Sequence, residues 1–278
     1  MVQSSGHLAT ERPQNIMKID HKESYQDFGE QFSVDNQYDD YLGSNELLKD
    51  IVDPFDLNLI KGKDIMEVGV GSGRICHNLL KYNPSSIVGI EPSKAFFVAK
   101  KNLSSDKVSL FNIKGENLNF ESKFDYVFSL GVIHHIPNYK LVLEKIRNSL
   151  KTNGKFIIWV YGKEGNELYL SIFNNLRKFT IKLPDFVLRI VSKILALCTY
   201  IYGFLCKFVP LPLHKYFTGM FSKLSFKNRT YVIFDQLNPS YAKYFKKTEL
   251  ENELQNCGFK IEKLSNRLDY SYTVICKK

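Results

Sequence analysis

Short apolar runs alternate with segments of helical spacing over most of the chain. Five of these runs predict buried strands, at residues 65–68, 86–91, 108–113, 126–130 and 155–161. Apolar positions three and four residues apart predict helices at residues 45–52, 75–82, 94–102 and 139–150. Strands that alternate with helices are typical of a doubly wound parallel sheet, so the predicted fold class is α/β.

The C-terminal segment predicts one more helix and a hairpin. Thr248 and Glu251 have the spacing of a capping box, so a helix should begin there and end near Gly258. Residues 259–264 and 270–276 are typical of two strands joined by a short polar link. We expect this hairpin to close the sheet.

Residues 163–247 lie between the fifth strand and the last helix, and the α/β core does not need them. Their centre, residues 186–209, is strongly apolar and lacks the alternation of a strand. Its longest run without a charged residue has 13 residues, fewer than the ~20 of a membrane-spanning helix. We therefore predict a helical insertion after strand five. The predicted segments are an N-terminal tail and flap (1–44), the α/β core (45–162), the insertion (163–247) and the last helix with its hairpin (248–278).

The positive charge of the chain is concentrated in this insertion. The whole chain carries a formal charge of +9, yet residues 1–161 hold 19 Lys and Arg against 20 Asp and Glu. Residues 168–230 hold ten basic residues and a single acid, Asp185. Two interpretations stay open. The insertion is either a cap packed over the substrate, or a cap whose basic apolar helix, residues 186–209, also contacts an anionic membrane surface.

The cysteines and the N-terminal residues indicate the cellular compartment in which we expect the protein. Five cysteines with no C-x-x-C pair predict reduced thiols, and neither a disulfide framework nor a metal site. The first residues lack the apolar core of a signal peptide. We expect a cytoplasmic protein, either free or peripheral on the inner face of a membrane.

The strongest chemical signal follows the first predicted strand. Gly69, Gly71 and Gly73 alternate at the turn into the next helix. Such a turn lets a ligand lie against backbone N–H groups near the positive end of a helix. A dinucleotide fingerprint, G-x-G-x-x-G, would place its third glycine where Arg74 stands.

With the acid that precedes it, this loop resembles the glycine loop of class I S-adenosylmethionine (SAM)-dependent methyltransferases of the small-molecule type. Three further stretches are similar to motifs of that family: residues 114–120 to G-D-A-E-N-L-P-F, 124–137 to F-D-x-V-x-S-x-G-V-L-H-H-L-P, and 150–156 to L-K-P-G-G-x-L. The resemblance covers residues 45–161 and 248–278. It implies a Rossmann-like sheet of seven strands and SAM as the cofactor.

The resemblance also implies which residues bind the cofactor. Glu67 would hold the methionine end and Glu91 the ribose hydroxyls, while Lys114 stands where the family has the acid that binds the adenine. The expected cofactor-binding residues are Glu67, Gly69, Val70, Gly71, Gly73, Glu91, Pro92, Gly115, Glu116, Asn117 and Leu130.

Residues 124–137 and the end of the fifth strand supply candidate catalytic residues. We expect in-line methyl transfer to an oxygen, with His134 or His135 as the base and Tyr161 contacting the sulfonium through a cation–π interaction. A purely structural turn is the other interpretation of the paired histidines. Residues 232–241 should bring Asp235, Gln236 and Tyr241 near the mouth of the pocket, or form a buried turn.

The expected acceptor is a small or lipid-linked molecule. Nucleic acid is not expected, because no RNA-binding module is recognisable. Two alternatives remain: an RNA-directed methyltransferase, which the pI of 9.1 favours, and a SAM-binding protein without turnover.

Overall fold

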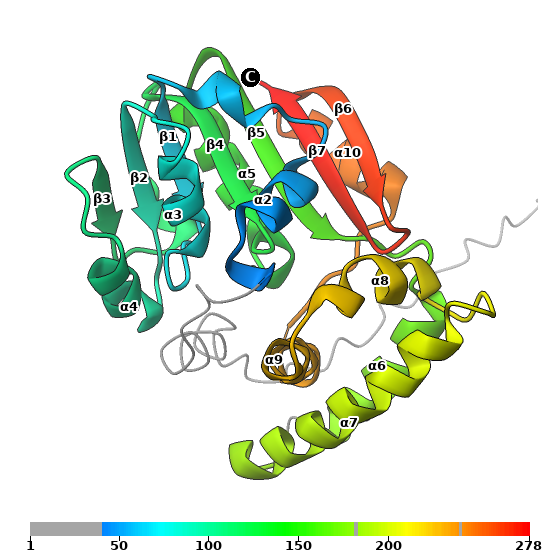
Figure 1. Cartoon of the computed structure of the whole chain (residues 1–278). Coiled ribbons are helices and arrows are strands. Elements are labelled where there is room, and N and C mark those ends of the chain that lie inside the picture. Colours follow the sequence, from blue (N-terminus) through cyan, green and yellow to red (C-terminus); the bar gives the residue numbers. More distant parts are fainter. Residues whose placement is uncertain (1–40, 181–182, 239–240) are drawn as a thin grey trace, which may run out of the picture.

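The computed structural model describes residues 41–180, 183–238 and 241–278, and shows a seven-stranded sheet flanked by helices (Figure 1). The strand order is β3-β2-β1-β4-β5-β7-β6. Strands β1 to β5 are parallel, and β7 runs antiparallel to both neighbours. The strands are β1 (Asp64–Val68), β2 (Ser86–Ile90), β3 (Val108–Phe111), β4 (Phe124–Leu130), β5 (Leu150–Tyr161), β6 (Lys260–Arg267) and β7 (Ser271–Lys277). The predicted α/β fold with its closing antiparallel hairpin is confirmed.

Helices cover both faces of the sheet, because successive side chains of a strand point to opposite faces. In β1, Ile65 packs in one cluster with residues of α2, α3 and α4, and Met66 packs in another with residues of α5 and α10. Both side chains are fully buried, as expected of a parallel strand covered on both faces. These helices are α2 (Asn45–Val52), α3 (Arg74–Leu80), α4 (Ala95–Asn102), α5 (Tyr139–Ser149) and α10 (Lys247–Asn256).

Two local predictions are wrong. The predicted strand 155–161 is too short, because β5 begins at Leu150 and includes residues 151–154, where the backbone of Asn153 is left-handed with a φ of 67°. α10 begins at Lys247, and the carboxylate of Glu249 accepts a hydrogen bond from the backbone N–H of Lys246 at 3.4 Å. The first turn of α10 therefore uses residues 246 and 249 rather than 248 and 251.

The insertion after β5 is helical in the part of the chain that the structure describes. Its helices are α6 (Glu167–Thr180), α7 (Asp185–Leu205), α8 (His214–Gly219) and α9 (Phe226–Leu237). Leu188 and Ala196 of α7 pack with Ile233 and Leu237 of α9 in a cluster that also includes Ile51 of α2. The insertion thus has a core of its own, which joins the sheet domain through α2. In Figure 1, α7 lies at the outer edge of the molecule, away from the sheet.

The predicted tail and flap, residues 1–44, lies outside the described residues except for 41–44. Tyr41 and Leu42 are buried in the cluster of the insertion. The segment boundaries given above stay predictions.

Candidate active site

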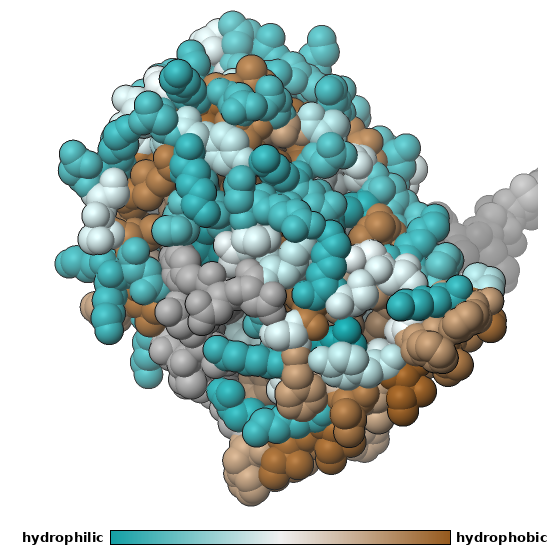
Figure 2. Space-filling model, viewed as in Figure 1, coloured by the Kyte–Doolittle hydropathy of each residue, from teal (hydrophilic) through white to brown (hydrophobic). Residues whose placement is uncertain are grey.

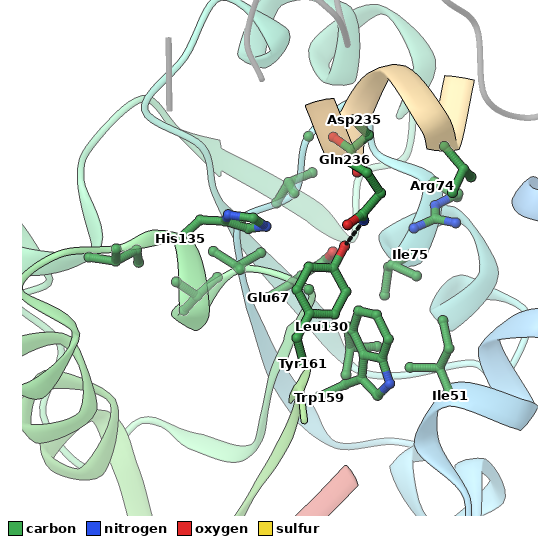
Figure 3. Close-up of a pocket in the computed structure, with 18 of the residues that line it drawn as sticks. Ile51, Glu67, Arg74, Ile75, Leu130, His135, Trp159, Tyr161, Asp235 and Gln236 are labelled. Atoms are coloured by element: carbon green, nitrogen blue, oxygen red, sulfur yellow. Dashed lines mark hydrogen bonds between the residues drawn. The ribbon is translucent and has the colours of Figure 1, made fainter. Parts of the chain in front are cut away.

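A cavity of about 430 Å³ opens at the carboxyl ends of β1, β2, β4 and β5 (Figure 3). In open α/β sheets, ligands bind at this edge, where the strand order reverses. Here the reversal lies between β1 and β4. The ends of the strands contribute Val68, Ile90 and Leu130, and helices α2 and α9 contribute Ile51 and Asp235.

The glycine turn lines one side of the cavity. Gly69, Gly71 and Gly73 have positive φ values of 86°, 56° and 96°, a conformation that glycine adopts without strain. A Cβ atom at Gly69 would overlap the side chain of Val132. Gly69 and Gly71 line the cavity, whereas Gly73 is the N-cap residue of α3. The turn therefore brings bare backbone to the cavity, as a close ligand requires.

Glu91, which follows β2, is bonded to this turn. Its Oε2 accepts a 2.8 Å hydrogen bond from the N–H of Gly71, and its Oε1 accepts one of 2.9 Å from the N–H of Ser93. Each carboxylate oxygen has a second lone pair, so the group can also accept bonds from two hydroxyls of a ligand. The carboxylate of Glu91 thus lies at the cavity in a position fixed by the backbone N–H groups of Gly71 and Ser93.

Glu67 at the end of β1 is a buried carboxyl group at the same cavity. The residue is 2% exposed, and its Oε2 has no hydrogen-bond partner among the described residues. Burial raises the pKa of Glu67 to about 8. A buried polar atom without a partner costs free energy, which a cationic ligand group would offset. Glu67 and Glu91 therefore fit a ligand with an ammonium group and a diol, such as SAM.

The two histidines occupy different environments in a short helical turn, Ile133–His135. The ring of His134 is fully buried, has no hydrogen-bond partner among the described residues, and packs on Tyr161 at 4.1 Å between centroids, with the two rings tilted by 42°. Burial holds the pKa of His134 well below its usual range. His135 lines the cavity, and its Nδ1 lies 3.0 Å from the carbonyl oxygen of Tyr241.

Since a carbonyl oxygen only accepts, Nδ1 of His135 carries the proton and Nε2 is left as an acceptor. Burial lowers the pKa of His135 to about 4. Both imidazoles are therefore neutral near pH 7, and His135 is a weak base there.

The opposite side of the cavity is held by Gln236 of α9. Its Nε2 donates to the hydroxyl of Tyr161 at 2.9 Å, and its Oε1 accepts from the hydroxyls of Tyr169 at 2.7 Å and Tyr244 at 3.3 Å. Arg177 donates from Nε to the backbone carbonyl oxygen of Gln236 at 2.7 Å and from Nη2 to the hydroxyl of Tyr244 at 3.2 Å. This network fixes an aromatic wall that strand β5 and the insertion build together.

Asp235, beside Gln236, brings a carboxyl group to this wall (Figure 3). Its Oδ1 is enclosed and has no hydrogen-bond partner among the described residues. Burial raises the pKa of Asp235 to about 7, although the positive charges of Arg177 and Arg74 act in the opposite direction. A carboxyl group of that pKa exchanges protons near neutral pH, as a general base must.

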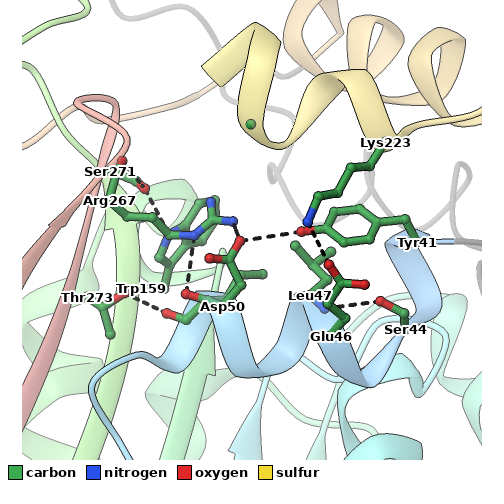
Figure 4. A network of polar contacts seen from close by, with 12 residues as sticks. Tyr41, Ser44, Glu46, Leu47, Asp50, Trp159, Lys223, Arg267, Ser271 and Thr273 are labelled. Carbon is green, nitrogen blue, oxygen red and sulfur yellow. Dashed lines mark hydrogen bonds and ion pairs between the residues drawn. The ribbon is translucent and has the colours of Figure 1, made fainter. Parts of the chain in front are cut away.

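Polar contacts tie α2 to the hairpin and to the insertion at the side of the cavity (Figure 4). Arg267 of β6 forms an ion pair and hydrogen bond with Asp50 of α2. Lys223 of the insertion forms an ion pair with Glu46 at 2.6 Å. Because α2 also contributes Leu47 and Ile51 to the cavity, these contacts position that wall.

The structure brings most of the predicted site residues to one cavity. Those lining it are Glu67, Gly69, Val70, Gly71, Glu91, Pro92, Gly115, Glu116, Leu130, His135 and Tyr161. Gly73, Asn117 and His134 do not line it, nor does Tyr241. Asp235 and Gln236 lie in the wall of the cavity, as expected of residues near the mouth of the pocket. The roles assigned to these residues remain predictions.

Sequence reasoning missed Arg177, Tyr169, Tyr244 and Trp159. Arg177 contributes to the basic composition of the insertion but lies in no motif, and Tyr169 and Tyr244 lie in no motif either. Trp159 at the end of β5 lines the cavity, and its Nε1 donates to the hydroxyl of Ser271 at 3.0 Å. Position at the end of a central strand is the one signal that would have found it.

Comparison with known proteins finds a family model that matches part of the chain. Residues 66–156 match the family model of a methyltransferase domain. A solved SAM-dependent methyltransferase of Methanosarcina mazei superposes with a TM-score of 0.51 at 16% identity, over 78% of this chain and 93% of that chain. The pyocyanin biosynthetic protein PhzM superposes with a TM-score of 0.51 at 14% identity, over 83% of this chain and 53% of its own. At these identities the structures show the shared fold.

Curated relatives carry a more specific name. The tRNA U34 carboxymethyltransferase of Pseudoalteromonas atlantica is 31% identical over 112 residues, 39% of this chain and 35% of the relative. The enzyme of the same name from Campylobacter concisus is 32% identical over 133 residues, 46% of this chain and 45% of the relative. The chain thus matches less than half of the length of these relatives.

These relatives contradict two expectations from the sequence. A small-molecule or lipid-linked acceptor was expected, and nucleic acid was not, whereas the relatives are named for tRNA. The first expectation relied on the resemblance to small-molecule methyltransferases and on the apolar basic insertion, neither of which identifies the acceptor. The second relied on the lack of a known RNA-binding module, but an enzyme can bind RNA through surfaces outside such modules. The RNA-directed alternative fits the findings better.

Proposed function

Because this chain carries a class I SAM-dependent methyltransferase domain, we propose that it alkylates tRNA, with the uridine at position 34 as the acceptor nucleoside. The observation that carries this proposal is the similarity to enzymes named tRNA U34 carboxymethyltransferase. That similarity spans less than half of each relative, so the acceptor side is argued from the residues of this chain.

The donor that we propose is SAM or a SAM that carries a carboxylate on the transferred methyl group. When bound, it supplies an alkyl group already activated on a sulfonium, so the main task of the protein is to align two reactants. Glu67 would take the ammonium group and Glu91 the ribose hydroxyls, and the backbone at Gly69 and Gly71 leaves room for a ligand. Oε2 of Glu67, which no group in residues 41–180, 183–238 and 241–278 bonds, supports this assignment.

The aromatic wall supports a nucleobase as the acceptor. Trp159, Tyr161 and Tyr244 line the cavity, and the rings of Tyr161 and Tyr244 are stacked at 5.2 Å. Enzymes that act on a base take it out of the RNA stack and hold it against aromatic or apolar side chains. Because Gln236 holds Tyr161 and Tyr244 by hydrogen bonds, this wall is formed before a base arrives.

Asp235 is the residue that we propose as the base. The accepting atom of the uridine, a ring N–H or a ribose hydroxyl, must lose its proton as its new bond to carbon forms and the carbon–sulfur bond of the donor breaks. Oδ1 of Asp235 faces the cavity without a hydrogen-bond partner among the residues that the structure describes, and it can take that proton. Its pKa of about 7 suits this role better than the pKa of about 4 of His135.

The test is transfer of label to separated fractions. The purified full chain is incubated with SAM labelled on the methyl group, and in parallel with carboxylated SAM, in the presence of total tRNA, ribosomal RNA and a lipid extract. We expect label in tRNA alone. Label in lipid or in small molecules, with none in tRNA, would contradict the proposal.

The controls separate the enzyme from contaminants. Gly71→Arg should remove all transfer, because the side chain would fill the cavity at a position with a φ of 56°. Gly203→Arg should leave transfer intact, because a Cβ at Gly203 meets no atom within 4 Å.

A further inference from the structure

Helix α7 carries a continuous apolar stripe on its outer side. Phe186, Ile190, Ile194, Leu197, Ile201 and Phe204 follow one another at three- and four-residue spacing, and all are exposed, Phe186 at 67% and Ile201 at 66%. The stripe continues past the end of the helix with Phe208 and Val209, both also exposed. Figure 2 shows it as a brown band along the lower edge of the molecule, over the position of α7 in Figure 1.

The inner side of the same helix is packed against the rest of the insertion. Leu188, Ser192 and Ala196 are buried, and Leu188 and Ala196 pack in the cluster formed with α9. The two sides of α7 are therefore both apolar, and only one is covered. A contiguous exposed apolar surface of this kind marks an interaction site in a soluble domain.

A cationic pocket lies beside the stripe. Its volume is about 260 Å³, and it is lined by three cationic residues, by Thr230 and by three aromatic residues: Arg189, Lys193, Lys227, Thr230, Phe226, Tyr231 and Phe234. The guanidinium of Arg189 lies 5.0 Å from the ring centroid of Phe234, which holds it at the pocket. No acid lines this pocket in the part of the chain that the structure describes. Three cations and a hydroxyl in one hollow are suited to an anionic oxygen group such as a phosphate.

We propose that α7 is a docking helix for an anionic phospholipid bilayer, with the stripe in the apolar boundary of the membrane and the cationic pocket on a lipid phosphate. The charge of the pocket is complementary to an anionic headgroup layer, and the stripe is complementary to the acyl chains beneath that layer. RNA would neutralise the pocket but leave the stripe in water. A second copy would cover the stripe but place cationic pockets near one another.

The helix lies along the membrane rather than across it. Among the described residues, one helix, Phe186–Leu205, is long and apolar enough to span a bilayer by length and composition. Its inner side, however, is packed on α9, and Arg189 and Lys193 stand in its first half. A spanning position would pull α7 off α9 and bury two cations in the acyl region.

Sedimentation with vesicles tests this proposal on the full chain. We expect the protein to pellet with vesicles of phosphatidylcholine and phosphatidylglycerol at low salt, and about tenfold less with phosphatidylcholine alone. The binding should weaken as salt is raised. Equal pelleting with both vesicles would overturn the anionic part of the proposal, and no pelleting would overturn all of it.

Matched variants test each component. Phe186→Ser combined with Ile194→Ser should lower vesicle binding about tenfold, whereas Phe97→Ser on α4, which removes a side chain that is also 67% exposed, should not. Lys193→Glu combined with Lys227→Glu should also lower vesicle binding about tenfold. Lys100→Glu combined with Lys101→Glu on α4 should leave vesicle binding unchanged. All variants should keep wild-type circular dichroism and SAM affinity, because none of these residues lines the cavity.

Two other outcomes would overturn the proposal. Salt-sensitive RNA binding that is lost in Lys193→Glu with Lys227→Glu, without any vesicle binding, would assign the pocket to RNA. A concentration-dependent dimer in light scattering that is abolished by Phe186→Ser with Ile194→Ser would assign the stripe to a second copy.

Discussion

The two halves of the cavity are built in different ways. On the side proposed for the cofactor, Glu67 lies near the end of β1, and Gly71 and Glu91 stand in the turns that directly follow β1 and β2. On the acceptor side, Gln236 bonds to Tyr161 and Tyr169, which are 75 and 67 positions away in the sequence. The cofactor side is therefore local in sequence and carries motifs, whereas the acceptor side exists only through tertiary contacts of the insertion.

This contrast predicts that substitutions on the two sides affect different steps. A change on the cofactor side should weaken SAM binding. A change on the acceptor side should leave SAM binding intact and lower turnover of the acceptor. Variants that violate this division would show that the cavity acts as one unit.

The largest effect is expected from Gly71→Arg. The φ of 56° at Gly71 strains any residue that has a side chain, and an arginine there would reach into the cavity that Gly71 lines, so SAM affinity should fall more than about 100-fold. Isothermal titration calorimetry measures this, with Gly203→Arg as the control. Unchanged affinity would mean that the glycine turn does not contact the cofactor.

Asp235→Asn should lower the maximal rate about 100-fold, because the amide cannot take a proton. SAM affinity should not change. The rate of the native enzyme should rise with pH through about 7, as the carboxyl group of Asp235 loses its proton, and the variant should lack that rise. Rates measured from pH 5 to 9 with saturating SAM test this. A pH profile shared by both proteins would exclude Asp235 as the base.

Glu67→Gln should weaken SAM binding about 30-fold (~2 kcal/mol), because it removes the charge that would face the ammonium group. It should also change the effect of pH on stability. Since burial raises the pKa of Glu67 from 4.5 to about 8, the native fold binds this proton more tightly than the unfolded chain. The free energy of unfolding without cofactor should thus fall as pH rises from 4.5 to 8.

Urea unfolding at several pH values measures this slope. The fall should be smaller in Glu67→Gln, which has no proton to lose. A variant with the same slope as the native protein would show that Glu67 ionises normally in the fold.

The smallest effect is expected from Gln236→Leu. It removes the hydrogen bonds to Tyr161 and Tyr169 and should lower kcat/KM for the acceptor about fivefold (~1 kcal/mol). SAM affinity should stay constant. Gln255→Leu, at an exposed site on α10, is the matched control. Equal kinetic parameters in the two variants would contradict a positioning role for Gln236.

The same contrast explains what the sequence could predict. Apolar spacing located the strands and helices because Ile65 and Met66, adjacent in β1, pack on opposite faces of one sheet. The glycine turn can be recognised in the sequence because positions with positive φ values are usually occupied by glycine. The pattern could not separate His134 from His135, since only the tertiary fold decides which ring of a short turn reaches the cavity. Nor could it foresee the network that joins Arg177 to Gln236 and Tyr244, because no local pattern records contacts over such distances.

On the function proposed above, this cavity brings a SAM-type donor to the uridine at position 34 of a tRNA. Mass spectrometry of nucleosides tests it most directly, on tRNA incubated with the full chain and either SAM or carboxylated SAM. We expect the nucleoside at position 34 to be heavier by the mass of the transferred group. The native enzyme and Gly203→Arg should form it, and Gly71→Arg should not. An unchanged position 34, with the transferred group recovered from another molecule, would contradict it.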